Sequence, residues 1–529
     1  MSSLLNSLAS EAVPKEDPDA AYAGYGGNDG GGATAPSAPP PPFPSADERP
    51  VLAAPAYHDA AFAYAFLLHA MLIVFMAFAW GVRAVNVDAT MPADDGSREV
   101  MDFNASTMTK LVAVACVVGG VAAVTFLALL KRCAGNLVRF ALYASVAVQL
   151  VATCAMFAVS ALFGFFMCLP LALTCLWVYV AQRRIPFAAA HVELAVEATS
   201  SFPLLFPFAV CMMLLSFVWL QLWSLAAFGL ENVANNGGTA GAPSSRGGSM
   251  TGGVLVFGMI VSLVWGSQLV SYVTEFVVCA TVGAWWFSAS PGAPVLPSLR
   301  RAVTNSLGSL SLAALVVAVL EALRLAARQA QRAQARRQNG VLAFVACVGT
   351  CILTCVERLI ETLNTWAVVM MALKGDDFRT AGGQVMDLFR TRGFGLIVNE
   401  DLVLPALRIA CLVPACIAAI TGGALSFVGT TQLAPADRGT LAGIAAFLSF
   451  LMGYALCSVL SGVIASGVKT FVVAFALNPG ALGVTHPEAL GKLVSAWNAA
   501  SGYPEEFRAS GHDAYFGSGG NRAYAVPNV

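Results

Sequence analysis

Charged residues are scarce in this chain of 529 residues. Asp, Glu, Lys and Arg together make up 11% of it, whereas they make up roughly 25% of an ordinary soluble domain. Hydrophobic residues account for 58%, and the mean hydropathy is +0.72. This composition excludes a soluble globular protein and gives no support to a nucleic-acid partner. We therefore predict an all-α, multi-pass protein of the lipid bilayer.

The motifs of common enzyme sites are also missing. The chain has no Walker phosphate-binding loop, no nucleophile elbow and no HExxH zinc motif. Its five His have no spacing that a metal ion uses, and its 13 Cys lie in or beside apolar segments, which argues against structural disulfides. We therefore expect no enzymatic activity, no cofactor and no bound metal. We interpret His69, in the middle of an apolar segment, as a packed and hydrogen-bonded side chain.

Apolar segments follow one another from residue 60 onward, and each has at least about the 20 residues that a hydrocarbon core of roughly 30 Å requires. We predict about ten transmembrane helices, at residues 60–82, 111–130, 137–159, 162–181, 203–228, 254–287, 303–323, 341–373, 402–428 and 441–477. Residues 56–480 thus form a transmembrane domain. The segment 185–201, with Glu193 and Glu197 between aliphatic residues, is predicted to be an amphipathic cytosolic helix.

Two pairs of basic residues set the expected orientation. Lys131–Arg132 and Arg183–Arg184 are cytosolic if the N-terminus is cytosolic, as the positive-inside rule requires, and ten crossings then place residues 481–529 in the cytosol too. Residues 1–55 are rich in Gly, Ala, Ser and Pro and lack the pattern of a cleavable signal peptide. We predict a disordered cytosolic tail there, with a polyproline-binding partner as an alternative. The sequon at Asn104 would face outward and is a candidate glycosylation site.

Two features leave the crossings of one region open. The segment 254–287 is too long for one upright helix, and an Arg occupies every fourth position of 324–336. If every segment crosses once, this Arg stripe lies outside, against the positive-inside rule. If 254–287 crosses twice and the charged segment 341–373 does not cross, the stripe lies inside. We favour single crossings.

The stretch 341–392 carries a distinctive order of residues. An apolar run with three Cys precedes a Glu, an aliphatic helix, an Asn, a short apolar segment, and a Gly before a Phe and a small residue. These positions are Cys347, Cys351, Cys355, Glu357, Asn364, Ala367, Gly375, Phe378 and Ala381. The pattern resembles the choline transporter-like family.

Further stretches resemble the same family in the same order, at residues 280–287, 306–309 and 466–488, the last being most similar to the shorter fungal and protist members. The resemblance covers roughly residues 55–500. It implies a transporter of choline or a related amino alcohol, in the plasma membrane or an organelle membrane. Two positions depart from the family pattern: Asn478 replaces an acid before Pro, and Lys469 stands where the residue is usually uncharged.

One face of the segment 254–287 collects polar and aromatic side chains. At 100° per residue, one third of the helix circumference holds Trp265, Gln268, Tyr272, Glu275 and, if the helix is continuous, Trp286. Aromatic faces and a nearby acid are what holds a quaternary ammonium. An unpaired carboxylate is also costly in a membrane, so a passing cation would compensate it. We predict that these residues bind a choline-like cation. The alternatives are packing against neighbouring helices and, for Trp286, a place at the membrane interface.

Other interpretations stay open. Glu357 and Arg358 form either a cytosolic gate with Lys374 or Arg379, or a solvated face. A different class of function is a non-transporting scaffold or receptor that recruits partners through its Pro-rich tail. That alternative predicts that the tail matters and the polar stripe does not.

Two short segments predict close helix packing. Gly439–Gly443 and Gly462–Ser466 place small residues at steps of four, which lets helix backbones approach one another in a membrane.

Overall fold

The computed structural model describes the chain in eight stretches. These are residues 57–82, 105–181, 185–236, 250–288, 291–336, 340–392, 403–430 and 435–499. Every regular element in these stretches is a helix, which confirms the all-α prediction. The predicted tail 1–55, the sequon at Asn104 and the residues from 500 onward lie outside the described residues, so their predictions stay predictions.

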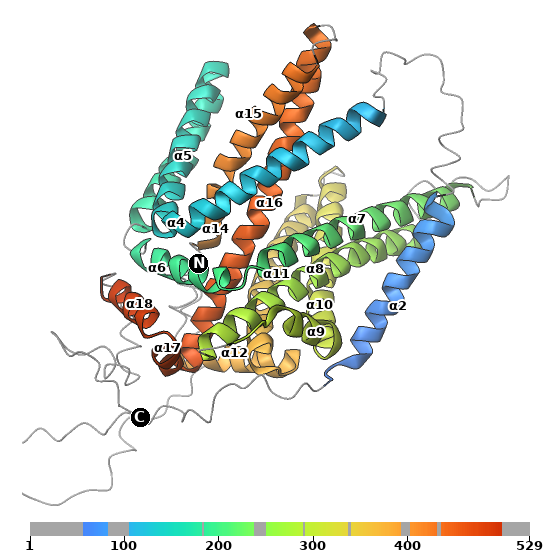
Figure 1. The fold of residues 1–529 in the computed structure, drawn as a ribbon. Coiled ribbons are helices and arrows are strands. Elements are labelled where there is room, and N and C mark those ends of the chain that lie inside the picture. The colour runs from blue at the N-terminus through green and yellow to red at the C-terminus, as the bar shows by residue number, and fades with distance from the viewer. Residues whose placement is uncertain are drawn as a thin grey trace, which may run out of the picture. The chain divides into compact units, whose positions relative to one another are not determined.

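Long helices make up most of the described chain (Figure 1). They are α2 (Ala60–Met76) with its π-helical continuation η3 (Ala77–Gly81), α4 (Ala105–Val159), α5 (Ala161–Ala181), α7 (Leu205–Asn236), α8 (Met250–Phe287), α10 (Leu307–Arg336), α11 (Gly340–Lys374), α15 (Leu412–Gly429) and α16 (Pro435–Leu477). Shorter helices connect or flank them: α6 (Ile185–Ser200), α9 (Val295–Thr304), α12 (Phe378–Arg392), α14 (Val403–Ala410), α17 (Pro479–Thr485) and α18 (Pro487–Ala499).

Seven helices of the described chain are long and apolar enough to cross a membrane. The chain is therefore a multi-pass membrane protein, as predicted. The other three predicted crossings fall in the second arm of α4, in α5 and in α11. The two arms of α4 meet at Cys133, whose φ of −137° and ψ of 30° are not helical, directly after the basic pair that separates two predicted segments.

The segment 254–287 forms one unbroken helix, α8. The alternative in which it crosses twice is therefore wrong. Helix α10 continues through the Arg stripe to Arg336, as expected, and α11 then runs back along it. The Asn364 amide of α11 donates to the Ala313 carbonyl of α10 at 3.1 Å, and Arg324 of α10 bonds to Glu357 of α11. These contacts make α10 and α11 an antiparallel pair, which favours single crossings.

Arg301 fixes α9 to two of the long helices. Its guanidinium donates to the Ala372 carbonyl of α11 and lies over the Phe276 ring of α8, 4.9 Å from the ring centroid. Burial lowers the pKa of Arg301 to about 10, which leaves it charged at pH 7. A charge held in this way ties α9 to the end of the α10–α11 pair.

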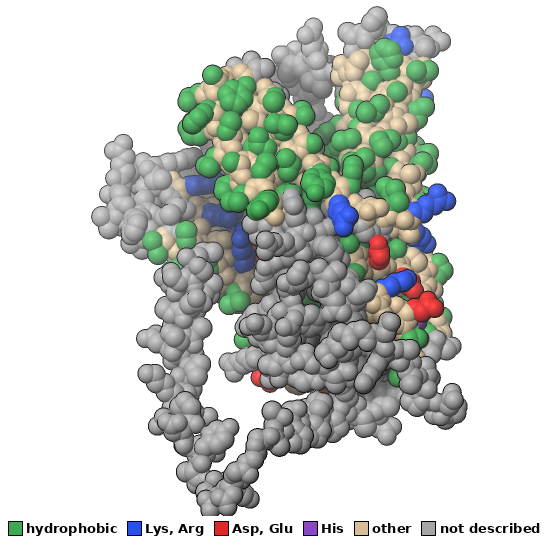
Figure 2. Space-filling view, turned by 90° about the vertical axis from the view of Figure 1, so that its left-hand side faces the viewer, with side chains coloured by type: hydrophobic (Ala, Val, Ile, Leu, Met, Phe, Trp, Pro, Cys, Tyr) green, Lys and Arg blue, Asp and Glu red, His purple; other side chains and the backbone are tan. Residues whose placement is uncertain are grey.

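Apolar side chains also cover the outside of the helices. Figure 2 shows hydrophobic side chains over the upper half of one face, with most charged side chains below them or at their edge. On α5 the exposed large residues are Leu162, Phe165, Phe166, Met167, Leu169, Leu173, Leu176, Trp177 and Tyr179. An apolar surface of this extent suits contact with lipid. On α6, by contrast, Glu193 and Glu197 are exposed and the aliphatic residues are buried, as an amphipathic helix requires.

Close helix packing is found at one end of the predicted segment Gly462–Ser466, where the Cys279 thiol of α8 donates to the Ser466 carbonyl of α16 at 3.7 Å, but not at the glycines of either predicted segment. A Cβ at Gly439, Gly443 or Gly462 would meet nothing within 4 Å. A tight contact lies instead between α15 and α16, where a Cβ at Gly422 would come within 2.0 Å of the Ser449 hydroxyl. Gly spacing alone does not reveal which face of a helix turns to a neighbour.

The backbone just before α2 rests on the start of α10. The Ser309 hydroxyl donates to the Asp59 carboxylate at 2.7 Å. A Cβ at Gly308 would come within 2.3 Å of the Asp59 carbonyl oxygen, which is backbone and cannot turn aside. Gly308→Ala should therefore separate the two segments and cost about 1–3 kcal/mol. Thermal unfolding of the purified protein measures this loss.

The matched control for this prediction is Gly383→Ala in α12, where a Cβ meets open space. That variant should unfold at the wild-type temperature or slightly above it, because Ala favours a helix over Gly by up to about 1 kcal/mol. Equal unfolding temperatures for Gly308→Ala and Gly383→Ala would contradict the contact.

The side of the Arg stripe is tested by chemical labelling. With a cytosolic N-terminus and single crossings, the exposed Arg332 lies outside. A cysteine at this position, in a variant depleted of other Cys, should react with an impermeant thiol reagent in sealed cells. Reaction only after permeabilisation would place the stripe in the cytosol and reverse the expected orientation.

Candidate functional site

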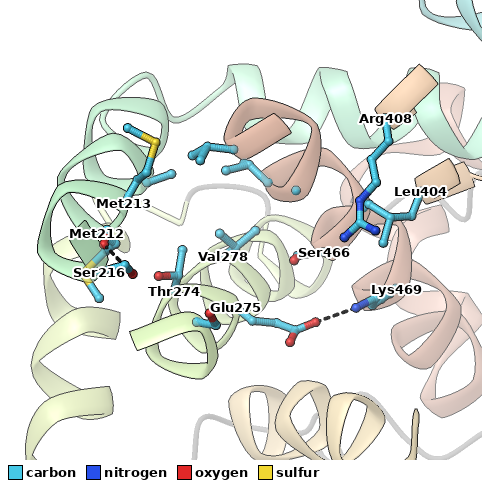
Figure 3. A pocket seen from close by; sticks show the side chains of 16 residues that line it. Met212, Met213, Ser216, Thr274, Glu275, Val278, Leu404, Arg408, Ser466 and Lys469 are labelled. Carbon is cyan, nitrogen blue, oxygen red and sulfur yellow. Dashed lines mark hydrogen bonds and ion pairs between the residues drawn. The ribbon is translucent and has the colours of Figure 1, made fainter. Parts of the chain in front are cut away.

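A cavity of about 390 Å³ lies between four helices, and it contains an ion pair (Figure 3). Ligand pockets span about 300–1,000 Å³, so its size suits a small solute. The lining residues are Ala209, Met212, Met213 and Ser216 of α7; Ser271, Thr274, Glu275 and Val278 of α8; Leu404 and Arg408 of α14; and Val459, Gly462, Val463, Ala465, Ser466 and Lys469 of α16.

Helical spacing explains why these residues meet. On α7, α8 and α16 the lining positions recur at intervals of three and four, so each helix presents one face to the cavity. Hydroxyls on these faces satisfy their own helices: the Thr274 hydroxyl donates to the Val270 carbonyl at 2.8 Å. Gly462 has no side chain, which leaves the wall of α16 open at that point. The cavity is thus a gap between helices rather than a break in one.

The ion pair joins α8 to α16. The Lys469 ammonium donates to a Glu275 carboxylate oxygen at 2.7 Å, with side-chain exposures of 21% and 13%. Each residue would be costly alone in hydrocarbon, at roughly 2.5 to 3.5 kcal/mol on insertion scales. The expectation that Glu275 is unpaired until a cation arrives is therefore wrong, because Lys469 already compensates its charge.

Arg408 adds a second cation to the lining. It lies on α14, its side chain is exposed, and within the described chain its guanidinium forms no ion pair. Figure 3 shows Arg408 and Lys469 extending from the same side of the cavity, opposite the helix that carries Glu275. The cavity therefore has an acidic wall on α8 and a basic wall on α14 and α16.

The structure separates the five predicted cation-binding residues. Of these, only Glu275 lines the cavity. Trp265 is buried, its indole N–H donates to the Ser311 carbonyl at 2.9 Å, and its ring stacks on His69 with centroids 4.9 Å apart. Trp286 is also fully buried, and its N–H donates to the Asn478 carbonyl at 3.3 Å.

The two remaining residues of the predicted set lie on α8 near the others. Tyr272 is 4% exposed and lies near Asn364 and Glu361 of α11, whereas Gln268 is half-buried. His69, which we interpreted as packed, is confirmed in that role by a 2.7 Å hydrogen bond between its Nε2 and the Ser262 hydroxyl. The aromatic part of the predicted stripe therefore belongs to the packed interior.

A second ion pair links α10 to α11. Glu357 is buried, and its partner is Arg324, the first Arg of the stripe, with Glu321 also 4.0 Å from that Arg. The predicted gate partners of Glu357, Lys374 and Arg379, do not form this pair. Arg324 compensates the charge that made the segment 341–373 a doubtful membrane helix.

The sequence matches a family model described as the plasma-membrane choline transporter over residues 165–480. This region includes every residue that lines the cavity. The protein PNS1 of Gibberella zeae is 23% identical over 342 residues, or 64% of this chain and 61% of that protein. PNS1 of Mycosarcoma maydis is 28% identical over 255 residues, or 48% of this chain and 47% of that protein.

A CTL-like protein of Dictyostelium discoideum is 23% identical over 317 residues, or 59% of this chain and 52% of that protein. The matches thus span from about half to about three-fifths of the length of these relatives.

Breaking the Glu275–Lys469 ion pair of the cavity should lower the stability of the folded protein. Lys469→Met removes the ammonium from Glu275, and Glu275→Gln removes the carboxylate charge from this pair; each should cost about 3 kcal/mol, as expected for breaking a buried pair. The double variant removes both charges and should recover most of that loss. Thermal unfolding of the purified protein in a neutral detergent measures all three.

The matched control for this prediction is the surface pair of Lys492 and Glu197, 3.8 Å apart with side-chain exposures of 68% and 50%. The same substitutions there should change stability by less than about 1 kcal/mol. If the two pairs behaved alike, Glu275 and Lys469 would not be paired in the folded protein.

Proposed function

Because the chain belongs to the plasma-membrane choline transporter family, we propose that this membrane transporter carries choline or a related amino alcohol through the cavity that Glu275 lines. We propose the plasma membrane as its location, because the matching family model is described as a plasma-membrane transporter. Transport rather than catalysis is the proposed role of the cavity residues. The PNS1 and CTL-like relatives support this class of function without naming a substrate.

The observation that carries the proposal is the ammonium already bound at Glu275. The Lys469 ammonium lies 2.7 Å from the carboxylate, inside the membrane-embedded part of the chain. A site that holds one ammonium ion in this position has the charge and the room to hold another. The proposed substrate replaces Lys469 at the carboxylate when it enters, and Lys469 returns when it leaves.

This exchange keeps Glu275 compensated at each stage. A carboxylate left alone between helices would oppose every step in which the substrate departs. Lys has a flexible four-carbon stem and three donors, so its ammonium can leave the carboxylate and return without a change in the backbone. In this proposal Lys469 is the counter-ion of the empty state.

The other four residues of the predicted set receive a supporting role in this proposal. The indole N–H of Trp265 donates to a backbone carbonyl of α10, and that of Trp286 donates to the carbonyl of the residue before α17. Tyr272 packs toward α11. Together with Gln268 they hold the orientation of α8, and with it the direction in which Glu275 points.

Uptake of radiolabelled choline into liposomes that contain the purified protein tests the proposal. Glu275→Gln should lower uptake at least tenfold, equivalent to about 1.4 kcal/mol. The double variant Glu275→Gln with Lys469→Met should be equally impaired although its stability recovers, because the carboxylate that binds the cation is still missing.

The surface variant Glu197→Gln with Lys492→Met is the matched control and should transport normally. Normal uptake by the double cavity variant would show that the pair serves stability alone and that the cation binds elsewhere.

A further inference from the structure

The two helices that carry the ion pair close on one another at the end where α16 leads into α17 (Figure 1). Beyond the lining residues of the cavity, α8 is buried at Trp285 and Trp286, and α16 is buried at Phe471. The centroid of the Phe471 ring lies 5.8 Å from that of Trp285 and 5.3 Å from that of Trp286. Three packed aromatic side chains therefore fill the space between α8 and α16 below the cavity.

A short helix holds this aromatic closure in place. Helix α17 has seven residues and lies between two non-helical residues, Asn478 and His486, whose φ angles are −154° and −142°. The Trp286 indole N–H donates to the Asn478 carbonyl at 3.3 Å, and the Thr485 hydroxyl donates to the Trp286 carbonyl at 2.9 Å. We call α17 with its two flanking residues the strap, because it ties the end of α16 to the end of α8.

Side chains fix both ends of the strap. At its start, the Asn478 side-chain oxygen accepts from the Ala481 N–H at 3.1 Å and so caps α17. At its end, the His486 ring stacks on Trp285 with centroids 3.9 Å apart and an angle of 23° between the planes. Between these ends Val484 is 86% exposed. The strap is thus docked on α8 through a small number of contacts, each of which a single substitution can remove.

The character of these contacts suits a segment that detaches and returns. Single hydrogen bonds and a single ring contact are individually weak. Non-helical residues at the ends of an element, as Asn478 and His486 are, can absorb the change in φ and ψ when that element moves. The strap can therefore leave α8 while α8 and α16 stay helical.

We propose that the strap is the gate of the cavity on this side: docked on α8 it keeps the aromatic closure shut, and when it detaches α8 and α16 separate there and the cavity opens. This inference rests on the proposed function, because a cavity that carries a solute across a membrane must open to each side in turn. In the predicted orientation the strap lies on the cytosolic side.

The gate is connected to the ion pair through two unbroken helix segments. Glu275 and Trp285 are ten residues apart on α8, and Lys469 lies eight residues before Leu477, the last residue of α16. At 1.5 Å per residue these distances are about 15 and 12 Å along the helix axes. Neither segment contains Pro. A separation of the two helices at the strap is therefore transmitted to the carboxylate and the ammonium of the pair.

Labelling of a thiol in the cavity tests the inference. Gly462→Cys places a thiol on the cavity wall, where a Cβ meets nothing within 4 Å. In the full-length protein depleted of other Cys, an impermeant thiol reagent is applied to sealed cells and to inside-out vesicles. Val484→Cys, made separately at the exposed position of α17, shows which preparation presents the strap to the reagent.

Two variants weaken the strap. Thr485→Val removes the hydroxyl that donates to Trp286 at nearly unchanged volume, and His486→Ala removes the ring that stacks on Trp285. Each should raise the labelling rate of the cavity thiol from the strap side about fivefold, the change expected for one lost hydrogen bond or ring contact. Labelling from the opposite side should not rise.

Conservative variants at the same positions are the controls. Thr485→Ser keeps the hydroxyl donor and His486→Phe keeps a ring on Trp285, so both should label at the rate of the parent protein. Val484→Ala changes an exposed side chain of α17 and should also have no effect.

A rise from the strap side alone, absent from the conservative variants, supports the gate. Three outcomes overturn it: a rise from both sides, which indicates a general loosening of the fold; a rise that the conservative variants share; and no rise in Thr485→Val or His486→Ala. Labelling needs no substrate, so the proposed function fails separately, by the absence of choline uptake from a protein whose strap opens as described.

Discussion

A carboxylate between membrane helices needs a positive partner, and the arrangement of α8 and α16 follows from that need. The Glu275–Lys469 pair is 2.7 Å long and largely shielded from solvent, so each charge is held where the other can compensate it. The Arg324–Glu357 pair meets the same need between α10 and α11. Both pairs connect different helices, so each charge has its partner only when the helices pack correctly.

The two pairs differ in what surrounds them. Glu357 is 5% exposed and lies in a contact between neighbouring helices, where its charge supports an antiparallel packing. The pair at Glu275 opens onto a cavity with a further cation, Arg408, on the basic side. A closed pair contributes to the fold, whereas a pair that faces an open volume can exchange partners. This difference is the physical reason for assigning function to one pair and not to the other.

The helices could be predicted from the sequence because hydrophobic length is a local property. The segments form helices near the predicted bounds, and the non-helical Cys133 divides α4 just after Lys131–Arg132.

Contacts between helices, by contrast, are not a local property of the sequence. Periodicity grouped Trp265, Tyr272 and Glu275 on about one third of α8, but that arc turned out to face several different neighbours. The same holds for Lys469 on α16. The periodicity of α16 alone does not reveal that Lys469 contacts Glu275 of α8. The pair could have been predicted from one feature of the sequence: Glu275 and Lys469 are isolated charges of opposite sign in two different membrane segments, and such charges usually pair with one another. Arg408, at the end of a short helix, carried no comparable signal.

The unbroken course of α8 limits how the cavity can open. Its 38 residues contain no Pro, and at 1.5 Å per residue the helix is about 57 Å long. Without a kink such as the one in α4, α8 moves as a rigid rod, and Glu275 moves with Trp286 at its far end. The acidic wall of the cavity therefore belongs to the same continuous helix as the buried Trp286, whereas the two basic side chains belong to separate helices, α14 and α16.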